Sequence, residues 1–245
     1  MTSNLIPKKL ETFYLNTIEK ILGFVLHFNL NPNFLTTLAL IIGIFAGYFF
    51  AIGKFIIAGI LTLLSGIFDT VDGKIARLTN RVTKFGALYD STLDRYAEVI
   101  VFFGIGVYLI KYNFYITSVA AVFAIGGSMM VSYIRARAEG LGFECNIGFM
   151  RRAERIVLLG FSSVFYFLHD HFVSFFDYVF EKINFDLPAY PPMPLSIAIY
   201  IMAVLTNITA FQRLHYVWKK SKEIEKLATQ PENEFATQNN KEVKK

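Results

Sequence analysis

Hydrophobic residues are gathered into long runs that polar stretches separate. Apolar segments lie near residues 34–53, 55–78, 86–110, 113–134, 153–169 and 193–217. A helix needs roughly 17–25 residues to cross a hydrocarbon core about 30 Å thick, and these runs have that length. Backbone polar groups must be paired within lipid, so spanning segments of this kind form helices. The pattern therefore predicts an all-α integral membrane protein with six transmembrane helices.

The two ends of the chain follow other patterns. Residues 7–28 place apolar side chains on one helical face and charged ones around the other. This indicates an amphipathic helix at the membrane surface, the alternative being a soluble-type helix packed on the bundle. Residues 219–245 are polar and predict a disordered tail. We therefore expect an N-terminal segment (1–30), a six-helix transmembrane domain (31–218) and a tail (219–245).

Basic residues are distributed unequally between the two sides of this predicted bundle. Loops after the first, third and fifth segments carry one basic residue each, Lys54, Lys111 and Lys182. The other loops and both termini are far more basic, which by the positive-inside rule orients them towards the cytoplasm of a cell membrane. The composition agrees with a membrane protein, at 54% hydrophobic residues. The net charge of +5 follows from this topology, so we expect no nucleic-acid partner.

Four aspartates lie inside apolar segments, where a charge near the bilayer centre costs about 2.5–3.5 kcal/mol. Asp69 and Asp72 stand three residues apart, and Asp90 and Asp94 stand four apart. Each pair therefore lies on one face of its helix. Two such helices packed face to face would bring four carboxylates together, which is a site for hard divalent cations such as Mg2+.

Small and basic residues extend both aspartate faces. Gly73, Ala76 and Arg77 continue the first face, and Gly86 precedes the second at the same four-residue spacing. Small residues leave room for a ligand or a neighbouring backbone. An arginine at the membrane edge can bind a phosphate with its planar guanidinium.

Together these positions read D-x2-D-G-x2-A-R-x8-G-x3-D-x3-D, from Asp69 to Asp94. This motif resembles the signature of the CDP-alcohol phosphotransferase family, and with the six-segment layout the resemblance covers about residues 7–217. It implies transfer from a CDP-linked lipid, usually CDP-diacylglycerol, to an alcohol, with release of CMP. It also implies two Mg2+ ions, with Mn2+ possible, and a homodimer.

The resemblance further implies roles for individual residues. Asp69, Asp72 and Asp90 would bind the metal ions, and Asp94 would share the metal site and act as base. Whether Asp94 is the base or a fourth metal ligand is left open by its spacing. The donor pocket would be lined by Asp69, Gly73, Ala76, Arg77, Gly86 and Thr36. Around Thr36, the alternative is an ordinary helix start in which Asn33 is the capping residue.

Arginines gather around the loop between the fourth and fifth segments, and they indicate a phosphorylated acceptor. The alternative is that they anchor the helices and pair with Glu139, Glu154 and lipid phosphate. The sequences SYIRARAE and RRAER resemble the branch of the family that uses inositol 1-phosphate. The candidate acceptor-binding residues are Ser132, Arg135, Arg137, Arg152, Arg155 and Arg213.

Two other functions are open at this point. A synthase using glycerol 3-phosphate would share the aspartate chemistry, and a cation transporter would also use intramembrane acids. Transport favours acids spread across the bilayer, whereas these cluster near one face beside arginines. Glu98 lies one turn beyond Asp94 and outside the motif. It could tune the site, but we expect it instead to pair with Arg95 or to contact a neighbouring helix.

Overall fold

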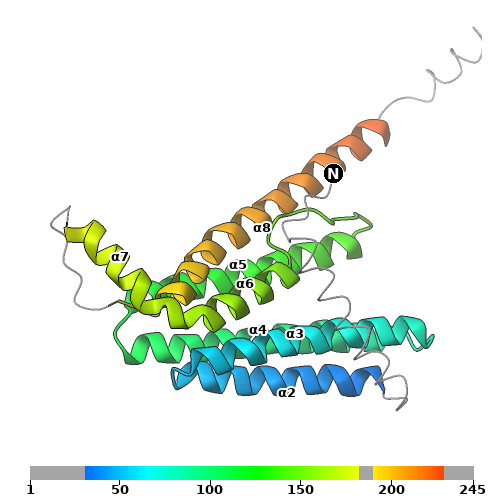
Figure 1. Ribbon diagram of the computed structural model, residues 1–245. Helices are drawn as coiled ribbons and strands as arrows, with labels where there is room; N and C mark the ends of the chain where they lie inside the picture. The colour runs from blue at the N-terminus through cyan, green and yellow to red at the C-terminus, as the bar shows by residue number, and fades with distance from the viewer. Residues whose placement is uncertain (1–30, 182–189, 229–245) are drawn as a thin grey trace, which may run out of the picture.

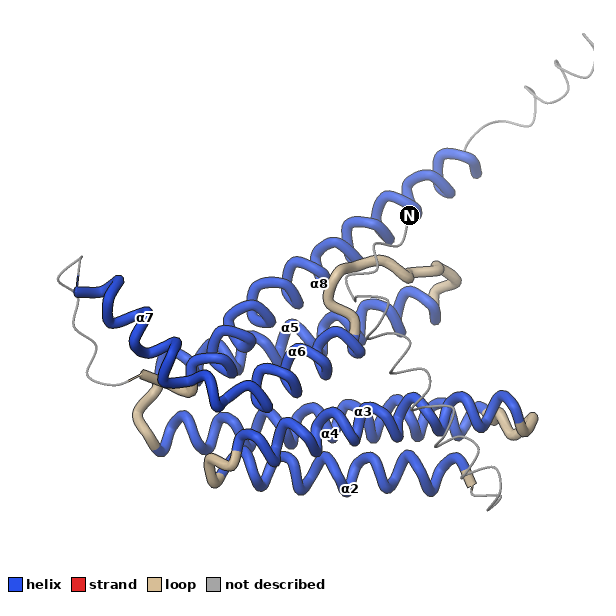
Figure 2. Tube along the Cα trace, in the orientation of Figure 1, coloured by secondary structure: helices blue, strands red, loops and turns tan. Residues whose placement is uncertain are grey.

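The computed structural model describes residues 31–181 and 190–228, and this part of the chain is helical throughout, apart from short loops (Figures 1 and 2). The predicted N-terminal amphipathic helix lies outside the described residues. The elements are α2 (Pro32–Ala51), α3 (Phe55–Leu78), α4 (Lys84–Lys111), α5 (Tyr115–Gly140), α6 (Arg152–Val164), the 3-10 helix η1 (Phe165–Leu168), α7 (His169–Glu181) and α8 (Met193–Ala228).

Two helices that carry site residues begin with a side-chain cap. Asn31 accepts a hydrogen bond from the Asn33 amide at 3.1 Å, and Pro32 occupies the first helical turn of α2. The expectation that Asn33 is the cap is therefore wrong by two residues, because proline supplies no amide donor and fits only after the cap. Thr83 caps α4 and accepts from the Gly86 amide at 2.9 Å.

Four helices end at a residue with left-handed backbone conformation. Gly53, Asn80, Asn113 and Gly142 follow α2, α3, α4 and α5 and have φ values of 76°, 54°, 62° and 83°. Glycine and asparagine are the residues that adopt this conformation most readily, and they commonly terminate helices. Gly53, Asn80 and Asn113 lie in short turns between consecutive helices, whereas Gly142 lies near the start of the longer loop 141–151 that leads to α6.

The helices form a closed ring. α2 packs along both α3 and α4, α4 also contacts α5, and α5 packs along α8. α6 closes the ring because it contacts both α8 and α3. α3 and α4 are consecutive in the chain but barely touch, and α6 packs along α3. In Figure 1, α6 runs above α3 and α4 in the view. Asp69 of α3 and Asp94 of α4 both contact Arg152 at the start of α6.

Within residues 31–181 and 190–228, five segments are long and apolar enough to cross a membrane: α2, α3, α5, Arg152–Tyr178 and α8. Large apolar side chains such as Phe103 and Ile116 point outward and are 72% and 80% exposed, as expected for lipid contact. The predicted all-α membrane architecture is thus confirmed. α4 has 28 residues but also six charged ones, so hydropathy alone does not select it as the sixth span.

α8 continues further than the sequence pattern predicts. It reaches Ala228, so the expected start of a disordered tail at residue 219 lies inside a helix. Lysine, glutamate and leucine are all good helix formers, and they extend α8 beyond its apolar part. Its 36 residues make a rod about 54 Å long, more than a bilayer requires.

α2 and α4 approach so closely that their backbones touch at glycines. A methyl group added to Gly104 would overlap the carbonyl oxygen of Gly47, whereas one added to Gly106 would meet nothing within 4 Å. We expect Gly104→Ala to lower the unfolding free energy by about 1–3 kcal/mol, the usual cost of overpacking. Thermal unfolding in detergent measures this effect.

Gly106→Ala is the matched control on the same helix. It should leave stability unchanged or raise it slightly, because alanine is the better helix former. Equal destabilisation by the two substitutions would contradict a close contact at Gly104.

Candidate active site

Three aspartates from two helices meet in the space between α3 and α4. Asp69 and Asp72 come from α3 and Asp90 from α4, and one carboxylate oxygen of each lies within 4.8 Å of the others. The structure thus brings together three of the four predicted acids. Carboxylate oxygens at this spacing are suited to one or two hard divalent cations.

Thr36 of α2 holds Asp72 in place. Its hydroxyl donates to Asp72 Oδ2 at 2.5 Å, and both side chains are buried. Thr37, one residue on, shares a hydrogen bond of 2.9 Å with the hydroxyl of Tyr89 on α4. Sequence reasoning assigned Thr36 to the donor pocket, and its contact in the structure is with a candidate metal ligand.

Asp90 carries a carboxylate oxygen without a partner. Its Oδ1 is buried and accepts no hydrogen bond within the described part of the chain. A buried carboxylate oxygen in this state is costly unless a cation or donor compensates it. The three aspartates therefore fit a divalent metal ion by position, by ligand type and by this unsatisfied oxygen.

Arg152 lies between two of the four acids. Its Nη1 is 2.5 Å from Asp69 Oδ2 and 2.5 Å from Asp94 Oδ2. Asp94 therefore lies next to the group of three and shares the Arg152 guanidinium with Asp69. All three side chains are partly buried, at 27%, 18% and 15% exposed, so this bridge is more than a solvated surface contact.

The small residues of the motif differ in what surrounds them. A methyl group at Gly73 would meet only the Arg77 guanidinium, at 3.7 Å, so the space beside Gly73 is open. Gly86 is crowded by Thr83 Oγ1 at 2.9 Å and Asn33 Oδ1 at 3.5 Å. Ala76 is partly buried. The room that the motif implies for a ligand therefore lies at Gly73 and the exposed Arg77.

The candidate acceptor residues do not form one cluster. Arg135 and Arg137 are exposed near the end of α5, and Arg135 pairs with Glu139 at 2.8 Å. Arg213 of α8 is buried and donates to the carbonyls of Val131 and Ile147, at 2.6 and 2.8 Å. This places Arg213 beside Ser132, which follows Val131 in α5 and is partly buried.

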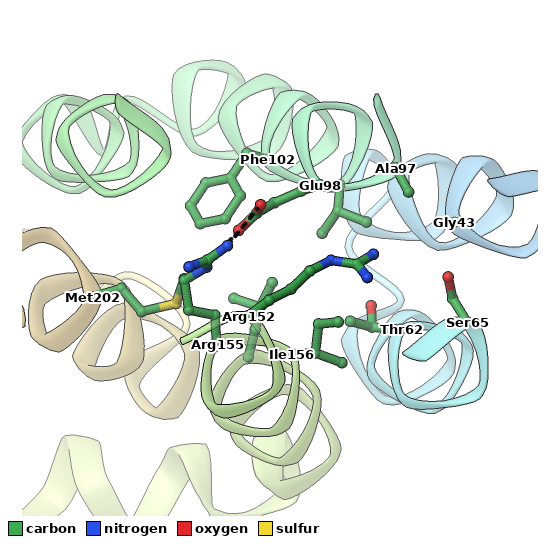
Figure 3. A pocket seen from close by; sticks show the side chains of 12 residues that line it. Gly43, Thr62, Ser65, Ala97, Glu98, Phe102, Arg152, Arg155, Ile156 and Met202 are labelled. Atoms are coloured by element: carbon green, nitrogen blue, oxygen red, sulfur yellow. Dashed lines mark hydrogen bonds and ion pairs between the residues drawn. The ribbon is translucent and has the colours of Figure 1, made fainter. Parts of the chain in front are cut away.

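Arg155 is buried and paired with Glu98, so the expected contact of Glu98 with a neighbouring helix is confirmed, although sequence reasoning did not identify Arg155 as the partner. Arg155 Nε and Nη2 donate to the two Glu98 carboxylate oxygens at 2.9 and 3.2 Å (Figure 3). The expected partner, Arg95, instead donates to the Ser91 carbonyl of its own helix. A charged residue on the buried face of α4 signalled a pair, but spacing along one helix cannot identify a partner on another.

A cavity of about 40 Å³ lies behind this pair (Figure 3). Its walls come from α2, α3, α4, α6 and α8, and apart from Glu98 and the two arginines they are mostly small or apolar. The charged groups of the site thus continue from the aspartates into the interior of the bundle.

Comparison with known proteins shows which family the chain resembles. A model of the family described as CDP-alcohol phosphatidyltransferase matches residues 29–216. The archaetidylinositol phosphate synthase of Methanothermobacter thermautotrophicus is 35% identical over 178 residues, which is 72% of this chain and 76% of the relative.

Solved structures match the fold as well. The phosphatidylinositol phosphate synthase of Mycobacterium tuberculosis with CDP-DAG bound superposes with a TM-score of 0.65 and 28% identity, covering 82% of this chain and 93% of the other. The same enzyme in complex with manganese and citrate gives 0.65 and 29%, covering 82% and 88%. The chain therefore belongs to the CDP-alcohol phosphatidyltransferase family and is a multi-pass membrane enzyme.

Proposed function

We propose that this protein is a phosphatidylinositol phosphate synthase, which transfers the phosphatidyl group of CDP-diacylglycerol to inositol 1-phosphate and releases CMP. The observation that carries the proposal is the group of Asp69, Asp72 and Asp90, with an unsatisfied Asp90 oxygen and the Arg152 guanidinium beside it. The names of the relatives support the acceptor, since they are synthases of inositol-phosphate lipids from archaea and bacteria.

Location and assembly follow from the same reasoning. The basic loops favour a cell membrane with the aspartates on the cytoplasmic side. The acceptor is a water-soluble phosphorylated alcohol, and such a site would receive it from the cytoplasm. The family resemblance implies a homodimer.

Asp69, Asp72 and Asp90 would hold divalent metal. Two such ions would supply positive charge to neutralise the pyrophosphate and the charge that develops on the transferred phosphoryl group and on CMP. Thr36 fixes the Asp72 carboxylate through its hydrogen bond. Gly73, Ala76, Arg77 and Gly86 would border the nucleotide, with Arg77 contacting phosphate at the exposed edge.

Asp94 is the candidate base. It lies outside the group of three and carries a carboxylate oxygen bonded to Arg152. Within hydrogen-bond reach of the acceptor hydroxyl, it would take up the proton as the new phosphodiester forms. Holding the hydroxyl and the phosphorus in line supplies much of the remaining rate enhancement.

Arg152 is the arginine best placed for the acceptor phosphate, because it already borders the reacting carboxylates. Arg135, Arg137 and Ser132 would extend the acceptor site towards the end of α5. Arg155 and Arg213 are the remaining members of the proposed acceptor site. Their guanidiniums bond to protein oxygens, so they would support the site from the interior of the bundle.

The acceptor can be tested with purified protein, CDP-diacylglycerol and Mg2+. We expect CMP release with inositol 1-phosphate and none with free inositol or serine, because the arginines require a phosphate. Release with glycerol 3-phosphate alone would keep the aspartate chemistry and overturn the acceptor. No release with any acceptor would overturn the proposed transfer reaction.

Asp90→Asn should reduce turnover by about 100-fold or more, as expected when one electrostatic group is lost at a reacting centre. Its melting temperature without metal should be equal or higher, because an uncompensated buried carboxylate is removed. The rise in melting temperature on adding Mn2+ should disappear.

Asp170→Asn, at an exposed position of α7, makes the same chemical change far from the site and should behave as wild type. Retained turnover in Asp90→Asn, or an undiminished response to Mn2+, would contradict the metal assignment.

Arg152→Met should tighten Mn2+ binding while lowering turnover. The guanidinium occupies Asp69, so a cation must compete with it, and an ion pair worth about 1 kcal/mol predicts about fivefold tighter binding. Titration calorimetry or Mn2+ electron paramagnetic resonance measures this change. Arg151→Met removes the same charge from an exposed neighbour and should leave the affinity unchanged. Weaker Mn2+ binding by Arg152→Met would show that Arg152 does not compete.

A further inference from the structure

We infer that Glu98, which lies outside the family motif, is a positioning residue that sets Arg152 against the aspartates by holding Arg155. The inference rests on the proposed transfer reaction and on the role of Arg152 in it. It assigns to Glu98 a contribution to acceptor binding and to metal affinity, although its carboxylate is bonded to protein groups and not to the aspartate cluster.

Glu98 is held from two neighbouring helices. Arg155 of α6 binds both carboxylate oxygens, and Ser128 of α5 donates to Oε1 at 2.5 Å. The Glu98 side chain is 13% exposed and that of Arg155 is 2% exposed. Bidentate pairing of a guanidinium fixes orientation as well as distance. The carboxylate therefore fixes the direction of one arginine on α6.

The Glu98–Arg155 pair is one of two ion pairs, spaced one helical turn apart, that align α4 with α6. Asp94 and Glu98 are one turn apart on α4, and Arg152 and Arg155 are one turn apart on α6. The Asp94–Arg152 and Glu98–Arg155 ion pairs are consecutive contacts between the same two helices. Only the first involves the reacting aspartates, and it must open when Asp94 takes a proton. The second keeps the helices in register while it does so.

Arg155 also holds the segment that leads into α6. Its Nη1 donates to the Met150 carbonyl at 3.3 Å, and the Met150 amide donates to Thr209 of α8 at 3.3 Å. Arg152 follows two residues later, so the position of its backbone depends on these bonds. A displacement of about 1 Å at a reacting centre can cost on the order of 100-fold in rate.

The surroundings of the pair favour a positioning role over simple stabilisation. Val101, Phe102, Leu159 and Met202 line the same cavity. In an apolar site of this kind, a hydrophobic pair generally contributes as much stability as a buried ion pair or more. The ion pair adds a fixed direction for Arg155 and, through the helix, for Arg152.

The test compares wild type with Glu98→Gln, which keeps the side-chain shape but loses the charge. We expect Mn2+ binding to tighten about as much as in Arg152→Met, because Arg152 is no longer held at Asp69. The KM for the phosphorylated acceptor should rise about tenfold, and the KM for CDP-diacylglycerol should stay within about twofold. A purely structural loss would lower the amount of active enzyme without tightening metal binding.

A double variant separates the proposed route from an independent effect. Glu98→Gln combined with Arg152→Met should bind Mn2+ no more tightly than Arg152→Met alone, because both changes act on the same guanidinium. If Glu98→Gln does not fold, Glu98→Gln/Arg155→Gln replaces it, since that variant buries no unpaired charge. Additive effects, or unchanged Mn2+ affinity and acceptor KM, would overturn the inference.

Glu144→Gln is the control for net charge, because Glu144 is exposed in the loop between α5 and α6. It should leave Mn2+ affinity and acceptor KM unchanged. The Mn2+ titration requires no turnover, so it tests Glu98 even if the proposed acceptor is wrong. If glycerol 3-phosphate proves to be the acceptor, the KM comparison is made with that substrate.

Discussion

The structure depends on compensating negative charge inside a membrane bundle. Asp69, Asp72, Asp90 and Asp94 lie on two helices that barely touch each other, and their charges would repel at this separation. Two kinds of partner compensate this charge: a threonine hydroxyl donates to Asp72, and a guanidinium binds Asp69 and Asp94. The buried Asp90 Oδ1 accepts no hydrogen bond within the described residues. The arrangement lowers the cost of burying these carboxylates and leaves carboxylate oxygens that can bind a cation.

α6 has a larger part in this balance than its length suggests. It supplies Arg152 to the aspartates and Arg155 to Glu98, and it closes the ring between α3 and α8. The site is therefore assembled from segments that are distant in sequence. α2 and α3 provide the supported carboxylate, α4 the acids of the opposite wall, and α6 the positive charge between them.

The aspartate site could be predicted because helical spacing alone decides which side chains share a face. Only that rule and the cost of burying charge were needed to pair Asp69 with Asp72 and Asp90 with Asp94. The pairing of Arg155 with Glu98 depends on how α4 and α6 are placed relative to each other in the ring, which no local pattern encodes. Hydropathy likewise identified five spans clearly and was weakest for α4, since the charges that build the site lower its apolar character.

The bridge made by Arg152 also bears on how the protein is made. Helices enter the membrane in chain order, so α3 and α4 arrive with their acids before the segment whose arginine pairs with two of them has been synthesised. α5 must follow, and then α6, before Asp69 and Asp94 gain their guanidinium. The first four spans therefore lack the positive partner of Asp69 and Asp94, which arrives only when the fifth segment docks.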